Sequence, residues 1–349
     1  MYTAPPVSLR TANTRLSCGE GLILKQLLGF SALALFVVGG TSCALLPKKN
    51  KPDLMPPHRT LSEKEVKELH AHVEAFQYHL DHKRYKDAEQ VLSAIRLEYP
   101  QMLALDLAPL LKAEDYLTRN KWLRAAKVYE GLLEDFPDSP LKDPTLKRLF
   151  KIGSAYLNGR RKSVLRVFHP HAYAEGVEIL EVVTNEVGLE DPNGMGLRAA
   201  KAVAVSHEKR VQYEEAYLKW LEISTVWQSG ELGEQALLGM AKNKRAVYNA
   251  RPPKRRALFD GTSLKTSRSY YDKFGVLFPE KAEELGIAEV IAEIDEQIAH
   301  KELSIGRYYR RTGKKQAANI YFDMIITNWP DTEAAQEART RVTTDDSHQ

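Results

Sequence analysis

The chain has very little cysteine. Its two cysteines, Cys18 and Cys43, both lie near the N-terminus of the 349-residue sequence. From Ala44 onward there is no thiol, so the rest of the chain cannot hold a disulfide framework, a zinc site with cysteine ligands or a cysteine nucleophile. The formal net charge of +4 is small, so the sequence gives no support for nucleic acid as a general partner.

Motifs for common catalytic and cofactor sites are also missing. The sequence contains no G-x-x-x-x-G-K-[ST], G-x-G-x-x-G, H-E-x-x-H or G-x-S-x-G. His169-Pro170-His171 offers two imidazoles, but no further ligand stands nearby and the proline holds the rings apart, so we expect no metal. Glu190-Asp191 and Glu283-Glu284 are interpreted as charges at helix ends rather than acid–base pairs. We therefore expect a binding protein, with neither enzymatic activity nor cofactor.

The first residues have the pattern of a secretory signal. Arg10, Arg15 and Lys25 precede an apolar run from Leu27 to Val38. A basic region followed by a short apolar run and small residues is typical of a signal peptide. The run is too short to span a bilayer core of about 30 Å, so we expect residues 1–42 to act as a signal for export.

Small residues ending in Cys43 resemble the lipobox of bacterial lipoproteins. The resemblance implies cleavage before Cys43 and lipid attachment at its sulfur, although Gly40 stands where such sites usually carry leucine. An uncleaved signal anchor over Gln26 to Leu46, which carries no charge, is the alternative. If Cys43 carries the lipid, residues 43–60 form the attachment site and a proline-rich tether between the membrane and the domain.

Small, aromatic and apolar residues recur at set intervals between Gly306 and Pro330. They are Gly306, Tyr309, Gly313, Ala318, Phe322, Ile325 and Pro330. These intervals match the tetratricopeptide (TPR) repeat, a helix–turn–helix unit of about 34 residues. Gly306 and Ala318 are small where two helices cross at roughly 8–10 Å, and Gly313 can end the first helix in a left-handed conformation. The same frame recurs from Ala113 to Pro137, with Asn120 in the place of the turn glycine.

Further copies of the second helix predict a stack of pairs. The copies are 88–100, 125–137, 176–188, 216–228, 267–279 and 318–330, and their first helices are expected near 62–82, 103–119, 145–158, 195–211, 231–248 and 287–312. Most copies carry aromatic residues in two columns, which a stack must bury against the next repeat. The prediction is an all-α TPR superhelix of about six helix pairs over residues 61–340, followed by a polar tail over 341–349.

Two insertions interrupt these repeats, at 158–170 and 249–266. The second lies in a basic run made of Lys242, Lys244, Arg245, Arg251, Lys254, Arg255 and Arg256. Pro252-Pro253 predicts that this run is an exposed turn. It is either a solvated loop or a patch for acidic lipid headgroups or an acidic partner.

Lys301 to Asp331 resembles the last repeat of the outer-membrane β-barrel assembly lipoproteins, the BamD family. The matching residues are Lys301, Glu302, Leu303, Arg307, Tyr308, Tyr309, Gly313, Ala317, Pro330, Asp331 and Thr332. Tyr85 to Pro100 resembles the first repeat, and the likeness is weakest over 140–270. The two insertions and Trp329, where tyrosine is usual, depart from the family pattern.

The resemblance implies a lipid-anchored scaffold on the periplasmic face of the outer membrane. In the family the N-terminal repeats are linked to unfolded barrel precursors, and the C-terminal repeats face the barrel-forming assembly subunit. For precursor binding this implies inner-face positions of the first two pairs: His72, Phe76, His79, Glu114, Leu117 and Thr118. An extended peptide that ends in an aromatic residue would then lie across Phe76 and Leu117. For the assembly subunit it implies Arg307, Arg310 and Arg311.

Two other functions stay open on the sequence. The TPR frame alone fits another secreted lipoprotein, used for pilus or cell-envelope assembly. An enzyme acting on envelope polysaccharide would need two carboxylates across a cleft, and the sequence shows no such pair. Only the likeness of the last repeat favours β-barrel assembly.

Overall fold

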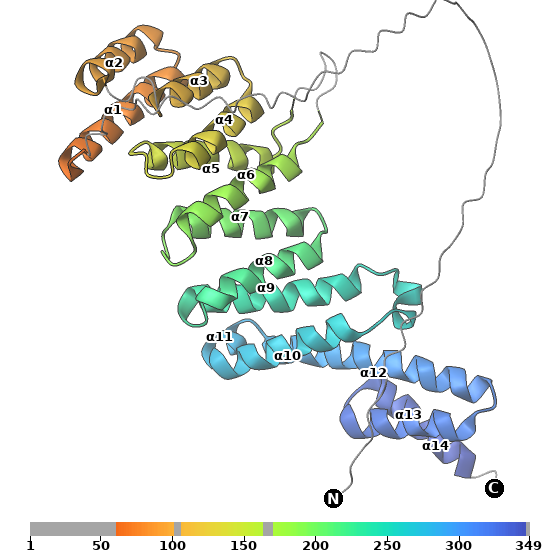
Figure 1. Ribbon diagram of the computed structural model, residues 1–349. Helices are drawn as coiled ribbons and strands as arrows, with labels where there is room; N and C mark the ends of the chain where they lie inside the picture. Colours follow the sequence, from red (N-terminus) through yellow and green to blue (C-terminus); the bar gives the residue numbers. More distant parts are fainter. Residues whose placement is uncertain (1–60, 101–105, 163–169, 347–349) are drawn as a thin grey trace, which may run out of the picture. The chain divides into compact units, whose positions relative to one another are not determined.

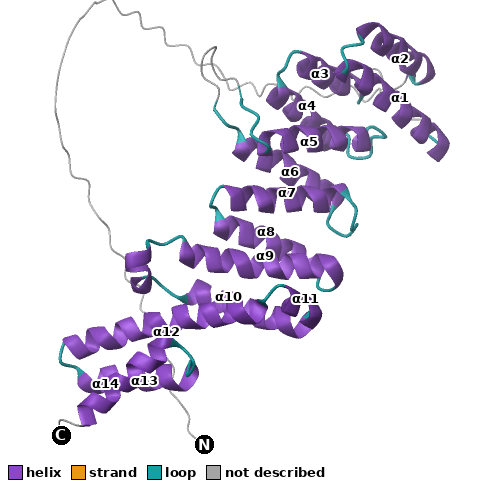
Figure 2. Ribbon diagram, turned by 180° about the vertical axis from the view of Figure 1, so that it is seen from behind, coloured by secondary structure: helices purple, strands orange, loops and turns teal. Residues whose placement is uncertain are grey.

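The computed structural model describes residues 61–346, except 101–105 and 163–169. Cys43, the signal region, the tether and His169 lie outside the described residues. The described part is helical, and Figure 2 shows no strand in it. Arg161 of the first insertion and His171, directly after it, form an isolated β-bridge. The predicted all-α repeat fold is confirmed.

The described residues contain the six expected helix pairs (Figure 1). They are α1 (Glu63–Asp81) with α2 (Tyr85–Glu98), α3 (Leu107–Thr118) with α4 (Trp122–Asp135), α5 (Lys142–Leu157) with α6 (Tyr173–Val187), α7 (Met195–Lys209) with α8 (Tyr213–Val226), α9 (Gly230–Asn249) with α10 (Thr262–Leu277), and α12 (Ile287–Arg311) with α13 (Lys315–Asn328). Ser62 and Glu65 form a reciprocal capping box at the start of α1.

Five of the six pairs turn through a residue in the left-handed conformation. The residues are Lys83, Asn120, Gly159, Val211 and Gly313, with φ of 59°, 59°, 93°, 63° and 80°. In each turn the next amide donates back to a carbonyl of the last helical turn at 2.7–3.0 Å. This closure satisfies carbonyls that the helix end leaves open. The pair α9–α10 instead carries the second insertion.

Small residues let the helices of a pair approach closely. A Cβ on Gly306 would lie 2.6 Å from Phe322 Cε1, and one on Gly153 would lie 2.7 Å from Leu180 Cγ. Since real side chains do not tolerate such distances, glycine is required at both crossings. The interpretation of Gly306 as a crossing residue is therefore confirmed.

The core is a series of overlapping clusters rather than one centre. The first cluster runs from α1 to α7, a second joins α7, α8 and α9, a third joins α9, α10 and α12, and the last joins α12, α13 and α14. Each pair therefore buries its apolar face against its neighbours, as expected for a repeat protein.

Three short elements were not expected from the sequence. They are the 3₁₀ helix η2 (Pro253–Leu258), α11 (Pro279–Glu284) and α14 (Glu333–Asp346). The last one runs into the segment expected to be a polar tail. Ala334, Ala335 and Ala338 of α14 are buried against α12 and α13, so this helix covers the final pair.

Candidate partner-binding pocket

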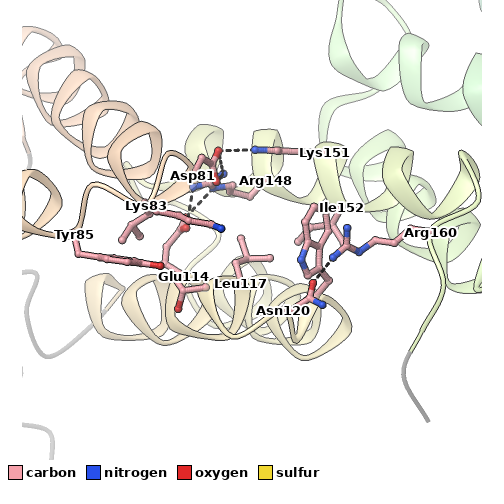
Figure 3. Close-up of a pocket in the computed structure, with 13 residues that line it drawn as sticks. Asp81, Lys83, Tyr85, Glu114, Leu117, Asn120, Arg148, Lys151, Ile152 and Arg160 are labelled. Atoms are coloured by element: carbon pink, nitrogen blue, oxygen red, sulfur yellow. Dashed lines mark hydrogen bonds and ion pairs between the residues drawn. The ribbon is translucent and has the colours of Figure 1, made fainter. Parts of the chain in front are cut away.

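A pocket opens where the first three helix pairs meet, at their turns (Figure 3). Its volume is about 390 Å³. The lining residues come from α1, α3 and α5, from the turns that follow them and from the first residues of α2 and α4. They are Leu80, Asp81, Lys83, Tyr85, Glu114, Leu117, Thr118, Asn120, Trp122, Arg148, Lys151, Ile152 and Arg160. Leu80, Leu117 and Ile152 give the wall an apolar stretch, while most of the other side chains are polar or charged.

The floor of the pocket is built on a buried ion pair between α3 and α5. Arg148 donates through Nε and Nη2 to the two carboxylate oxygens of Glu114, both at 2.9 Å. The two side chains are only 5% and 2% exposed. Glu114 Oε1 also accepts hydrogen bonds from Gln77 Nε2 at 2.7 Å and from the Tyr129 hydroxyl at 2.6 Å. One carboxylate thus ties together helices of the first three pairs.

The same arginine reaches the first pair directly. Arg148 Nη1 donates to both oxygens of Asp81, at 3.0 and 2.9 Å. Lys151 Nζ donates to Asp81 Oδ2 at 2.5 Å. Burial opposes ionisation of Asp81, but the hydrogen bond from Lys151 and the charge of Arg148 outweigh it, so the pKa of Asp81 is lowered. Burial and the neighbouring Glu114 raise the pKa of Tyr129 well above its ordinary value, so its hydroxyl stays a donor.

The rim of the pocket is positively charged. The Arg160 guanidinium lies 3.5 Å from the centre of the Trp122 ring and donates to the Asn120 side chain. Lys83 is exposed and forms no ion pair with any residue that the structure describes. The two acids of the lining are both paired with Arg148, whereas neither Lys83 nor Arg160 is paired with an acid in the described part of the chain. The pocket can therefore accept an anionic group at its rim and an apolar side chain along its wall.

Three of the residues expected in precursor binding line this pocket. They are Glu114, Leu117 and Thr118. Thr118 is exposed, and its hydroxyl donates to the Asp115 carbonyl at 2.8 Å. Glu114 is buried, and the contacts described above occupy its carboxylate. It therefore supports the floor of the pocket and is not exposed to a ligand.

The other three expected residues lie away from the pocket. Phe76 is 6% exposed and packs with Ala88 and Leu92, because its face of α1 is turned toward α2. The sequence-based model of a peptide crossing Phe76 and Leu117 therefore needs correction, since Phe76 offers almost no surface. His72 Nδ1 lies 3.4 Å from Glu98, and His79 Nδ1 lies 3.7 Å from Asp87.

Several pocket residues were missed by sequence reasoning. Arg148 follows Lys147 directly, in a helix with several charged residues, so the sequence did not mark it as the buried one. Arg160 was passed over because it lies in the first insertion. Lys83 and Trp122 join the site only when consecutive turns are brought together.

The expected C-terminal arginines are largely engaged within the chain. Arg307 Nε donates to Glu337 Oε1 at 2.8 Å, and Arg310 Nη1 lies 3.5 Å from the Arg341 carbonyl oxygen. Both contacts hold α14 on α12. Arg311 is exposed and stays a predicted contact for a partner.

The described residues contain neither a candidate metal site nor a helix suited to cross a membrane. No group of three or more histidine, cysteine, aspartate or glutamate side chains there is placed to hold a metal ion. Likewise, among the helices of residues 61–346, none combines the length and the apolar character that a membrane crossing requires.

Comparison with known proteins gives a family match and a likeness to solved structures. Residues 235–345 match the YfiO family model, described as an outer membrane lipoprotein. The chain also resembles the solved C-terminal part of a TPR repeat-containing protein from Cytophaga hutchinsonii, with 12% identity and a TM-score of 0.34, over 79% of this chain and 92% of that one. No curated protein matches. The fold assignment rests on the helix pairs themselves.

Proposed function

We propose that this protein is a membrane-anchored, non-enzymatic TPR scaffold that takes part in the assembly and insertion of β-barrel proteins in the outer membrane. The observation that carries the proposal is the match of residues 235–345 to an outer membrane lipoprotein family. That segment contains α12 and α13, whose sequence resembles the last repeat of the β-barrel assembly lipoproteins. Cys43 would carry the lipid and hold the helical domain at the periplasmic face of the membrane.

In this function the two ends of the repeat domain have different partners. The pocket of the first three pairs would receive an extended segment of an unfolded barrel precursor, with an anionic group at Lys83 and Arg160 and an apolar side chain against Leu117 and Ile152. The last pair and α14 would face the periplasmic domains of the assembly subunit, with Arg311 as an exposed cation. An open pocket beside stacked helices suits binding of a chain better than catalysis.

Co-purification tests the assembly role. The full chain is recovered from detergent-solubilised envelope, and the proteins that come with it are identified. Recovery of a β-barrel assembly subunit is the expected result. Recovery of pilus components would favour the alternative of a pilus or envelope assembly lipoprotein, and turnover of glycan by the purified chain would favour an enzyme. Mass spectrometry of the N-terminal peptide tests the lipid on Cys43.

A charge reversal tests the pocket. We expect Lys83→Glu to weaken binding of an extended peptide with an aromatic C-terminal residue by about fivefold, because it replaces one attraction worth about 1 kcal/mol at the rim. Fluorescence anisotropy of the labelled peptide measures the change. Lys86→Glu makes the same charge change at an exposed site on α2 outside the pocket and should leave binding unaltered. Equal affinities for both variants would place the peptide elsewhere.

A further inference from the structure

The second insertion, between α9 and α10, is held in place by hydrogen bonds to its backbone carbonyls. Arg256 Nη2 donates to the Asn249 carbonyl at 2.7 Å, and Arg256 Nε donates to the Arg251 carbonyl at 3.4 Å. Lys301 of α12 donates to the Ala257 carbonyl at 3.3 Å. Pro252 and Pro253 add stiffness at the start of η2. The backbone of the insertion is therefore held in place by its own side chains and by α12.

The exposed side of the insertion carries two basic side chains. The side chains of Lys254 and Arg255 are exposed and make no ion pair or hydrogen bond with any residue in the described part of the chain. Leu258, at the end of η2, is 81% exposed. The insertion has a single acid, Asp260, and its carboxylate accepts a hydrogen bond from the Thr262 hydroxyl at 2.9 Å. Two cations without an ion pair among the described residues and one exposed leucine therefore lie on the short helix η2.

Two other cations of the basic run are paired with acids. Lys244 and Arg245 lie in α9 and are paired with Glu214 and Glu293. They belong to the helical surface, so the exposed turn expected from the sequence is confined to the residues after α9. The excess positive charge is concentrated on η2.

A cavity beside η2 adds hydrogen-bonding groups to this surface. Its volume is about 540 Å³, and Arg251 and Phe259, which flank η2, both line it. The Arg251 guanidinium lies 5.1 Å from the centre of the Phe259 ring. The hydroxyl side chains of Thr262, Ser263 and Thr266 line the cavity as well. Arginine and hydroxyl groups are suitable donors for a phosphate oxygen. The carboxylates of Glu214 and Asp260 also line the cavity, so a phosphate is expected at the cations on η2 rather than deep inside the cavity.

We propose that the second insertion is a membrane-contact site for a bilayer with anionic phospholipids. Lys254 and Arg255 pair with lipid phosphates, and Leu258 enters the boundary between headgroups and acyl chains. This combination of basic and apolar side chains is typical of segments that lie in a bilayer interface. The inference rests on the proposed lipid attachment, which keeps a phosphate surface within reach of the domain. The insertion then fixes how the repeats face that surface.

Hydrogen exchange of the full chain tests this site. The protein is reconstituted in vesicles of phosphatidylcholine alone or with phosphatidylglycerol, and exchange is followed in the peptide covering 251–259. We expect slower exchange only with phosphatidylglycerol. Each cation near an anionic surface contributes about fivefold in affinity, so Lys254→Gln with Arg255→Gln should weaken the contact roughly 30-fold and abolish the protection.

A matched control removes two charges from a regular helix. Arg124→Gln with Lys127→Gln, both exposed on α4, should leave the protection intact. Equal exchange in both lipids, or protection that survives the change at 254 and 255, would overturn the proposal. Protection by inorganic phosphate without vesicles would do so as well, because it would identify a free-phosphate site. Retention of the chain in phosphatidylcholine vesicles tests the lipid attachment separately, and co-purification tests the assembly role.

Discussion

Arg148 and Glu114 face each other across α5 and α3 with two parallel hydrogen bonds of 2.9 Å. Both side chains are almost fully buried. A buried ion pair costs desolvation when it forms, but loss of one partner leaves an isolated charge in the core. Because Arg148 also holds Asp81 of α1, this pair sets how the first three helix pairs meet, and with them the shape of the pocket.

Replacing Glu114 should therefore be costly. We expect Glu114→Gln to lower the free energy of unfolding by about 3 kcal/mol, because Arg148 loses its buried charged partner and keeps only the partly exposed Asp81. Urea unfolding followed by circular dichroism measures the change. Glu134→Gln, at an exposed position of α4, should change stability by less than about 0.5 kcal/mol. If both variants lost the same stability, the ion pair would have no special role.

A neutral replacement of both partners separates charge from packing. Glu114→Leu combined with Arg148→Met removes the isolated charge that either single change creates. We expect the double variant to recover only part of the loss seen in Glu114→Gln. Apolar residues of similar volume replace a buried ion pair at little cost, but the buried donors of Gln77 and Tyr129 lose their acceptor. The same urea titration gives the comparison.

The floor of the pocket should also make stability depend on pH. The pKa of Asp81 is lowered in the folded protein, so its ionised form stabilises the fold above the ordinary value of 3.8 and this contribution is lost as pH falls further. Asp81 is partly exposed, so solvent screening limits the effect to about 1 kcal/mol. The destabilisation caused by Asp81→Asn should be present at pH 7 and shrink below pH 3.8. Unfolding midpoints at several pH values measure it, and a difference that grows in acid would contradict the assignment.

The helix pairs could be predicted because the residues that determine each pair lie close together within one repeat. Gly306, Ala318 and Phe322 specify one crossing within a short stretch of sequence, and Gly313 specifies its turn. The last helix, α14, gave no such signal. Its buried face consists of alanines, which the sequence pattern alone does not separate from a polar tail.

The pocket could be predicted only in part, since it is made by contacts between repeats. Leu117 and Thr118 were found from their place in the repeat, yet the same reasoning put Phe76 at the surface, where packing against α2 buries it. Lys83 and Arg160 are distant in sequence and line one pocket only after three pairs have stacked. The position within a repeat does not reveal which neighbours a side chain meets.

The close crossing of α12 and α13 gives a further prediction. We expect Gly306→Ala to destabilise the protein by about 1–3 kcal/mol, because the added Cβ would lie 2.6 Å from the Phe322 ring. Thermal unfolding followed by circular dichroism measures the loss. Gly131→Ala, in α4, meets no atom within 4 Å and should instead stabilise the helix by about 0.5–1 kcal/mol. Equal effects of the two changes would contradict the close approach seen at Gly306.

Val211 is the strained member of the five left-handed turns, so its replacement should stabilise the protein. Its φ of 63° is unfavourable for a β-branched residue, and the left-handed conformation costs about 1–2 kcal/mol for residues with a Cβ. The side chain is 61% exposed, so little packing is lost. We expect Val211→Asn to raise the free energy of unfolding by about 1 kcal/mol and the Tm by about 2 °C, because asparagine tolerates this conformation. Val205→Asn makes the same change in the unstrained helix α7 and should bring no gain. Calorimetry of both variants decides, since a Tm for Val211→Asn at or below that of the unmodified protein would show that the turn stores no strain.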